Sequence, residues 1–183
     1  MDQAVVRALA KWPAVPAVYG WLALDERGNW LLRNPATGKF GRIGNAALRD
    51  FICRNYVPDA RGCWYFQNGP QRVYARLACA PFVFRLEGGR FFDHCGRLIG
   101  PLRGAWRDER GALIIVAASG IGNVDDRDLL EASDLIDDSG AVAWFDCAAG
   151  RVPLGRILRA DLPAKFGFVP EPRPDPYAGA DMG

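Results

Sequence analysis

Apolar and polar residues alternate along many short stretches of the chain, and this period of two is typical of strands with one buried face. Between Arg72 and Cys79, the odd-numbered positions are apolar and the even-numbered ones are Arg, Tyr, Arg and Ala. Comparable stretches predict eight strands, at residues 18–24, 29–33, 63–67, 71–79, 82–86, 90–93, 112–118 and 141–146. Their closeness along the chain favours antiparallel neighbours joined by short turns.

Three other stretches predict helices, at residues 4–12, 45–56 and 126–135. The second is the best defined, because Asn45 is a good N-cap and apolar residues recur three and four positions apart from Leu48 to Tyr56. We therefore expect an α+β fold, with an antiparallel meander sheet and a few short helices packed on it.

A recurring pattern, Asp-x-x-Gly followed two positions later by an apolar residue, predicts turns that lead into strands. Aspartate is favoured at the first position of a type I turn and glycine at the fourth. The pattern occurs at residues 25–28, 59–62, 93–96, 108–111 and 137–140. The first three occurrences are 34 residues apart, but the intervening residues do not match, so we infer no sequence repeat from them.

Asn68-Gly69, between two alternating strands, is the strongest local signal for a hairpin, because a type I′ turn needs a positive φ at both central positions. Pro70 follows directly and cannot donate a hydrogen bond to a neighbouring strand, which also allows a longer loop or a strand at a sheet edge. One face of this hairpin should carry aromatic and basic side chains, and we expect a ligand to bind there. The expected site residues are Tyr65, Gln67, Arg72, Tyr74 and Arg76.

Length, composition and charge bound the organisation of the chain. With 183 residues, of which 50% are hydrophobic and 24% charged, it is long enough for one domain with a sizeable core. We expect a single α+β domain over residues 1–169, with a subdivision near 100–110 left open, and a proline-rich extended tail over 170–183. Residues 1–110 carry 17 basic and 9 acidic side chains, and residues 111–183 carry 6 and 12. This asymmetry suits either an anionic partner of the first part or an internal interface.

No stretch approaches the roughly 18 apolar residues of a membrane span, and the start, MDQAVVRALAKW, does not have the apolar core of a signal peptide. We therefore expect a cytoplasmic protein with no membrane partner. The five cysteines form no Cys-x-x-Cys pair, which argues against a zinc ribbon or finger. We expect neither a metal nor a cofactor.

The stretch ALIIVAASGIGNVDDRDLLEA, residues 112–132, has the order strand, Gly-x-Gly turn and helix that opens dinucleotide-binding units. Three aspartates (Asp125, Asp126 and Asp128) occupy the start of this helix, where they would repel a phosphate, and no further strand–helix–strand unit follows. A loop capped by aspartate is therefore the preferred interpretation.

Two groups keep an enzymatic alternative open. The acidic residues from Asp125 to Asp138 could bind a divalent cation through oxygen, but their spacing is not that of an EF-hand and a solvated loop is favoured. His94 is the single histidine, and Cys95 beside it would point to the opposite side of an extended segment. We interpret His94 as a surface residue of its Asp-x-x-Gly turn.

The run FQNGPQRVYARLACAPFVFRL, together with YGWLALDERGNW near the start and KFGFVP near the end, resembles an uncharacterised proteobacterial family, a domain of unknown function. The resemblance spans about residues 12–170, and its most specific part is the hairpin motif that begins FQNGPQRVY, at residues 66–76. The segment APF at residues 80–82 also resembles a second uncharacterised family with a small α+β structure. Neither family has an assigned reaction or assigned catalytic residues, so the resemblance implies no function.

We expect a non-enzymatic binding module that contacts a protein partner or a small ligand through its aromatic and basic face. The first alternative is a nucleic-acid or anion binder that uses the same face, since single-stranded nucleic acids stack on aromatic side chains and pair their phosphates with arginine. No RNP-like sequence accompanies the hairpin. The second alternative is a hydrolase or transferase with His94 or the acidic residues from Asp125 to Asp138 in its site.

Overall fold

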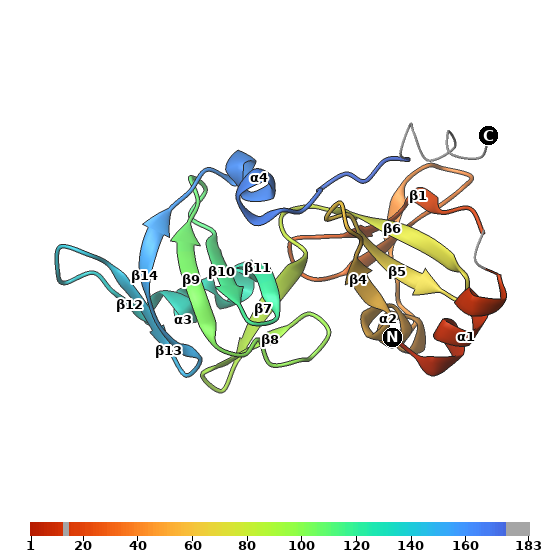
Figure 1. The fold of residues 1–183 in the computed structure, drawn as a ribbon. Coiled ribbons are helices and arrows are strands. Elements are labelled where there is room, and N and C mark those ends of the chain that lie inside the picture. The colour runs from red at the N-terminus through yellow and green to blue at the C-terminus, as the bar shows by residue number, and fades with distance from the viewer. Residues whose placement is uncertain (13–14, 175–183) are drawn as a thin grey trace. The chain divides into compact units, whose positions relative to one another are not determined.

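The structure is a computed structural model that describes residues 1–12 and 15–174. These residues form two compact units, between which the chain passes four times (Figure 1). Unit 1 consists of Met1–Leu24, Trp30–Leu77 and the chain from Val169 onward, and unit 2 consists of Asp25–Asn29 and Ala78–Phe168. Among the described residues, no helix has the length and apolar character needed to cross a bilayer.

Unit 1 is built on a six-stranded mixed sheet. Its elements are α1 (Gln3–Lys11), β1 (Val18–Leu24), β2 (Trp30–Arg33), β3 (Phe40–Arg42), α2 (Ala46–Arg54), β4 (Tyr56–Pro58), β5 (Trp64–Asn68) and β6 (Gln71–Leu77). The strand order is β3-β2-β1-β6-β5-β4, in which the central β1–β6 pair is parallel and the other four pairs are antiparallel. As predicted, Asn45 caps α2 by accepting a hydrogen bond from the backbone N–H of Leu48. Phe51 of this helix meets Phe66 of β5 edge-on, so α2 packs on the sheet.

Unit 2 is built on an eight-stranded mixed sheet. Its elements are β7 (Phe82–Glu87), β8 (Arg90–Asp93), β9 (Leu102–Arg107), β10 (Leu113–Ala117), β11 (Gly120–Val124), the 3-10 turn Asp126–Asp128, α3 (Leu129–Ser133), β12 (Ile136–Asp137), β13 (Trp144–Cys147), β14 (Gly150–Arg156), the 3-10 turn Arg159–Asp161 and α4 (Leu162–Phe166). The order is β12-β13-β14-β9-β10-β11-β7-β8, with β14–β9 and β11–β7 parallel. The sheet curls into a half-barrel. The curl brings the ring of Phe91 in β8, at one end of the order, to 5.9 Å from the ring of Phe145 in β13, near the other end.

The two units repeat one topology. Read from β3 to β4, the sheet of unit 1 has the same succession of pairings as the sheet of unit 2 read from β11 to β12, and a helix (α2 or α3) follows the third strand of each set. Strands β1 to β6 thus correspond in order to strands β9 to β14. The β7–β8 hairpin lies outside this correspondence. Leu24–Leu77 of the β1–β6 pair matches Arg107–Arg156 of the β9–β14 pair, and Asp-Glu-Arg-Gly follows directly after both Leu24 and Arg107.

The expected antiparallel meander is wrong, because both sheets are mixed and each is organised around a parallel pair. Alternation along one strand shows that it has a buried face, but it does not show which distant strand will lie beside it. The strands β9 and β14 were not predicted, because glycines interrupt their patterns. Gly104 and Gly155 both lie against the ring of Trp106, which fills the space that larger side chains would occupy.

Four of the five predicted Asp-x-x-Gly turns share one hydrogen-bonding pattern. In each, the aspartate carboxylate accepts the backbone N–H groups two and four residues later, as at Asp25, Asp59, Asp93 and Asp108. The glycine of each of these turns has a φ between 75° and 83°. The fifth turn differs, because Asp137 accepts hydrogen bonds from Ser139 and forms an ion pair with Arg151. Its glycine, Gly140, is not in the left-handed region. The described part of the expected tail, residues 170–174, contains neither helix nor strand, and residues 175–183 lie outside the described residues.

Candidate functional site

The β5–β6 hairpin forms as predicted, but its turn lies one residue later than expected. Asn68 pairs with Gln71, so Gly69 and Pro70 are the two central residues. Gly69 takes the positive φ of 56°, and Pro70 follows at a position that accepts a negative φ. This is the arrangement of a turn with glycine first rather than of the type I′ turn.

The five predicted site residues share one face of the sheet. Tyr65 pairs with Tyr74 and Gln67 with Arg72, and alternation along β6 brings Arg76 to the same side. Tyr19 of β1 joins them, because β1 is irregular around Gly20 and the ring of Tyr19 stacks on Tyr74 with 4.5 Å between centroids. We call these six side chains the tyrosine face: Tyr19, Tyr65, Gln67, Arg72, Tyr74 and Arg76.

Much of the tyrosine face is covered by its own chain. Tyr65, Gln67 and Tyr74 are buried, Tyr19 is half-buried, and Arg72 and Arg76 are exposed. Val57 and Val169 pack against the cluster that contains the buried tyrosines. The exposed part of the face is therefore two arginines with an aromatic layer beneath them. The buried Gln67 donates from its Nε2 to the carbonyl of Gly69.

A hydrogen bond holds Tyr74 in place. The Tyr74 hydroxyl donates to the Asp59 carboxylate at 2.9 Å. Burial and this bond raise the pKa of Tyr74 to about 12, so Tyr74 is protonated at neutral pH. Burial alone would raise the pKa of Asp59, but bonds from the Cys63 backbone N–H and the Tyr74 hydroxyl lower it, so Asp59 is charged. Tyr74 is therefore a hydrogen-bond donor here and not a base.

Arg72 and its counterpart in unit 2, Arg151, differ in their ion pairs. Its guanidinium lies 5.0 Å from the ring centroid of Tyr65, and Arg151 lies 5.0 Å from the ring centroid of Trp144 at the corresponding place in the β13–β14 hairpin. Arg151 also pairs with carboxylates, those of Asp137 at 3.0 Å and Asp146 at 3.9 Å. In unit 1 the position of Asp146 is held by Gln67, and no carboxylate of the described residues forms an ion pair with Arg72.

His94 lies in its predicted turn, but its ring points inward and not to the surface. Its Nδ1 accepts a 3.4 Å hydrogen bond from the backbone N–H of Val83, and its ring lies 5.8 Å from that of Phe82. Burial lowers the pKa of His94 to about 4, so the imidazole is neutral at pH 7. The turn pattern predicted the backbone here but not the direction of the side chain.

Three of the acidic residues after Val124 are paired with arginines. Asp125 pairs with Arg127, Asp126 with Arg27, and Asp128 with Arg85. Asp125 also caps its turn by accepting the backbone N–H of Arg127. The Gly-x-Gly sequence at residues 120–122 is part of β11 and not a phosphate-binding loop. These contacts describe an Asp–Arg network, with its carboxylates already engaged by cations.

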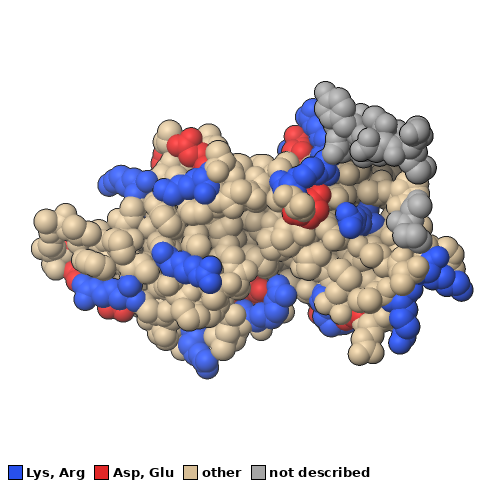
Figure 2. Space-filling model, viewed as in Figure 1, with Lys and Arg blue, Asp and Glu red and all other residues tan. Residues whose placement is uncertain are grey.

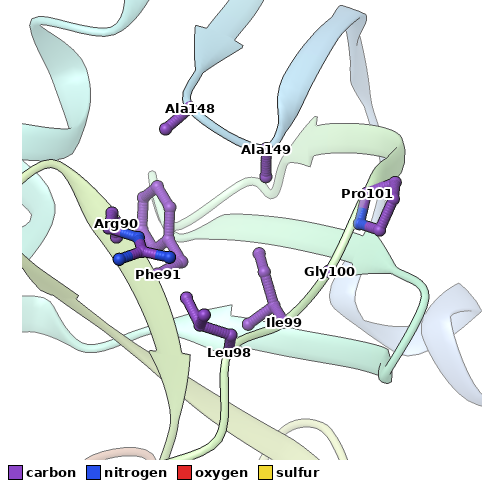
Figure 3. Close-up of a pocket in the computed structure, with 8 residues that line it drawn as sticks. All are labelled: Arg90, Phe91, Leu98, Ile99, Gly100, Pro101, Ala148 and Ala149. Carbon is purple, nitrogen blue, oxygen red and sulfur yellow. The ribbon is translucent and has the colours of Figure 1, made fainter.

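Two concavities of unit 2 were missed by sequence reasoning, because their residues come from distant segments. One, of about 470 Å³, is lined by the neighbouring arginines Arg107 and Arg156, by Lys165 and by the acids Asp108, Glu109 and Asp161. The other, of about 270 Å³, has a mainly apolar lining and is shown in Figure 3.

Comparison with known proteins gives a family and a fold. A family model described as "Protein of unknown function (DUF2946)" matches residues 1–173. A solved structure of a DUF1285 family protein from Silicibacter pomeroyi DSS-3 is similar, with a TM-score of 0.54 and 16% identity over 80% of this chain and 93% of that one. At this identity the likeness shows the fold alone. No curated protein matches the chain.

Proposed function

The chain belongs to the family described as "Protein of unknown function (DUF2946)", and we propose that it is a non-catalytic binding module whose tyrosine face contacts a carboxylate of a protein partner or small ligand. The proposed contact residue is Arg72, with Arg76 beside it, which also pairs with Glu171 at 3.7 Å. Tyr19, Tyr65, Gln67 and Tyr74 form the layer beneath the two arginines.

The observation that carries this proposal is the difference between Arg72 and Arg151. Both arginines lie 5.0 Å from the centroid of an aromatic ring. Arg151 is neutralised by Asp137 and Asp146, whereas the residue opposite Arg72, at the position of Asp146, is the uncharged Gln67. The hairpin therefore keeps a cation in a defined position without supplying its anion. An external carboxylate can complete the arrangement that Asp137 and Asp146 complete in unit 2.

The surroundings of Arg72 favour tight pairing. Burial would lower its pKa, but the Tyr74 hydroxyl and the Tyr65 and Asp59 groups nearby raise it, so Arg72 stays charged. An arginine that is already held over an aromatic ring loses less side-chain entropy on binding than a free one. A planar guanidinium also presents two parallel donors to a carboxylate.

A phosphate could occupy the same place, which keeps nucleic acid as the alternative ligand. On the side of the molecule drawn in Figure 2, lysines and arginines are scattered among uncharged residues and form no stripe. A continuous basic stripe is the usual footprint of a nucleic-acid track. We therefore favour a carboxylate partner.

Two defined probes test the proposal. Fluorescence anisotropy with a labelled hexaglutamate peptide and a labelled single-stranded oligonucleotide should be measured on the wild type and on Arg72→Gln, with Arg151→Gln as the matched control. We expect peptide binding that Arg72→Gln weakens about tenfold, equivalent to about 1.4 kcal/mol, and that Arg151→Gln leaves unchanged. Equal effects of the two variants, or no peptide binding, would contradict the proposal.

The oligonucleotide decides between the two anions. Tighter binding of the oligonucleotide than of the peptide, with an affinity that falls steeply as salt is added, would support the nucleic-acid alternative instead. Native mass spectrometry of gently purified protein, with the ratio of absorbance at 260 and 280 nm, would reveal a small ligand retained from the cell.

A further inference from the structure

The pocket in Figure 3 lies where the two ends of the curled sheet of unit 2 approach each other. Its lining is Arg90, Phe91, Leu98, Ile99, Gly100, Pro101, Ala148 and Ala149. We propose that this pocket binds a small amphiphilic carboxylate, with its apolar chain against Phe91 and Ile99 and its carboxylate at Arg90.

The pocket depends on a part of unit 2 that the repeated topology does not include. Six strands of each unit correspond, and the β7–β8 hairpin is what unit 2 adds. This hairpin supplies Arg90 and Phe91, and the chain after it supplies Leu98 to Pro101. The opposite wall is the β13–β14 turn at Ala148 and Ala149, which belongs to the repeated set.

Backbone hydrogen bonds hold together the three segments that form the pocket wall: β8, the chain after it and the β13–β14 turn. The N–H of Ile99 donates to the carbonyl of Phe91 at 3.2 Å, which fixes the chain after β8 to β8 itself. The N–H of Leu102 donates to the carbonyl of Ala149 at 2.9 Å, which fixes the same chain to the β13–β14 turn. A wall held by such bonds is preformed, and small-molecule sites are usually preformed.

The floor of the pocket is apolar and closed. Phe91 and Ile99 are only 2% and 1% exposed, whereas Leu98 at the rim is 49% exposed. In Figure 3 the side chains of Phe91, Leu98, Ile99 and Ala149 surround one open space. An exposed leucine beside a buried apolar floor is a surface that a hydrocarbon chain would cover.

Arg90 supplies the charge of the site. It lies in the pocket lining at the start of β8 and is exposed. The hairpin register places Arg90 opposite Glu87, yet no carboxylate of the described residues is in ion-pair distance of it. One cation next to an apolar pocket favours a monocarboxylate with an apolar chain over a polyanion or a neutral polar molecule.

The volume sets the size of the ligand. At about 270 Å³ the pocket is slightly smaller than the range of about 300–1,000 Å³ that is typical of sites for drug-sized ligands. A medium-chain fatty acid or a single-ring aromatic carboxylate fits this class, and octanoate is a suitable probe.

Isothermal titration calorimetry with octanoate and its neutral analogue octan-1-ol tests the proposal on the full chain. We expect saturable octanoate binding that Arg90→Gln weakens at least fivefold and that Arg103→Gln, an exposed arginine of β9 outside the pocket lining, leaves unchanged. Octan-1-ol should bind more weakly than octanoate and be insensitive to Arg90→Gln, because it makes no charged contact.

A second variant tests the location. Ala149→Leu places a larger side chain in the pocket wall and should weaken octanoate and octan-1-ol alike, while Arg72→Gln should change neither, which separates this site from the tyrosine face. NMR shifts of the Ala148 and Ala149 methyl groups on octanoate addition give a readout in the wild type. No saturable binding to the wild type, or equal weakening by Arg90→Gln and Arg103→Gln, would overturn the proposal.

Discussion

At the scale of single residues, His94 shows how burial alone changes chemistry. The ring of His94 accepts a hydrogen bond from the backbone N–H of Val83. Gly28 packs so closely against the Cβ of His94 that position 28 has no room for a side chain. Since burial disfavours the charged form, its folded pKa of about 4 lies below the value of about 6.5 expected in the unfolded chain.

This difference makes stability depend on pH. Between pH 4 and 6.5 the unfolded chain binds more protons at His94 than the folded protein does. The contribution of neutral His94 to the free energy of unfolding is therefore fully present above pH 6.5 and is lost as the pH is lowered toward 4. We expect His94 to account for a loss of up to about 3 kcal/mol over this range. Urea unfolding at pH 7, 5.5 and 4.5 measures it. His94→Gln, which removes the single histidine, should show a shallower decline, and an unchanged decline would contradict the assignment.

The sequence predicts which face of a strand a side chain lies on better than it predicts whether that side chain is buried. Alternation placed Arg72, Tyr74 and Arg76 on one face, and the register confirms it. It did not predict that Tyr74 would be covered, because Tyr19 and Val169 that cover the face are more than 50 and 90 residues away along the chain. For the same reason it did not predict that Gln67 would be almost fully buried.

At the scale of elements, the Asp-x-x-Gly turns are the most predictable feature. Short-range hydrogen bonds from one carboxylate to two backbone N–H groups decide their geometry, so the local sequence is sufficient. The turn of Asp108 has a further role, because its buried carboxylate also pairs with Arg159 at 3.0 Å. Arg159 in turn donates to Glu26 of the first Asp-Glu-Arg-Gly turn.

We predict that Asp108→Asn is strongly destabilising. The amide keeps an oxygen for the turn bonds but leaves the nearly buried Arg159 without one of its two carboxylates. Removing one partner of a buried ion pair costs about 3 kcal/mol. Asp137→Asn is the control, because its ion pair with Arg151 is exposed, and we expect no measurable shift of its urea midpoint. Similar effects of the two substitutions would show that burial is not the deciding factor.

Elements whose partners are distant were predicted least well. Both parallel pairs at the centre of the repeat, β1–β6 and β9–β14, join segments about 50 residues apart, which no local pattern specifies. The Gly-x-Gly sequence predicts a turn, because glycine is frequent in turns. In the structure these glycines lie in β11 against the rings of Phe82 and Phe84, where a larger side chain would clash.

At the scale of the whole molecule, the repeat was hidden from the sequence. The equivalent Asp-Glu-Arg-Gly turns begin at Asp25 and Asp108, and the equivalent arginines over aromatic rings are Arg72 and Arg151. These pairs are separated by 83 and 79 residues respectively, so one spacing does not describe both. The two units therefore share an order of strands, although few of their equivalent residues are identical. The candidate pocket of Figure 3 was equally hidden, because the added β7–β8 hairpin and the distant β13–β14 turn meet only after the sheet curls.

Unit 1 also depends on a segment far along the chain. The N–H of Val169 donates to Gly62, the N–H of Leu77 donates to the carbonyl of Pro170, and Pro172 is buried. We predict that a chain ending after Phe168 is destabilised by about 2–4 kcal/mol, since it loses these bonds and the contact of Val169 with the tyrosine cluster. A chain ending after Pro174 keeps every one of these contacts and should unfold at the wild-type urea concentration. Equal stability of the two truncated chains would contradict this role.

The same segment has a consequence for biosynthesis. Domains of growing chains generally fold in the order in which they are made. Here the strands of unit 1 are made first, but residues from Val169 onward, which unit 1 needs, are made after all of unit 2. During translation the tyrosines of β5 and β6 therefore remain without Val169 beside them while about 90 further residues are added. The nascent protein is most open to unwanted association, and to chaperones, in this interval.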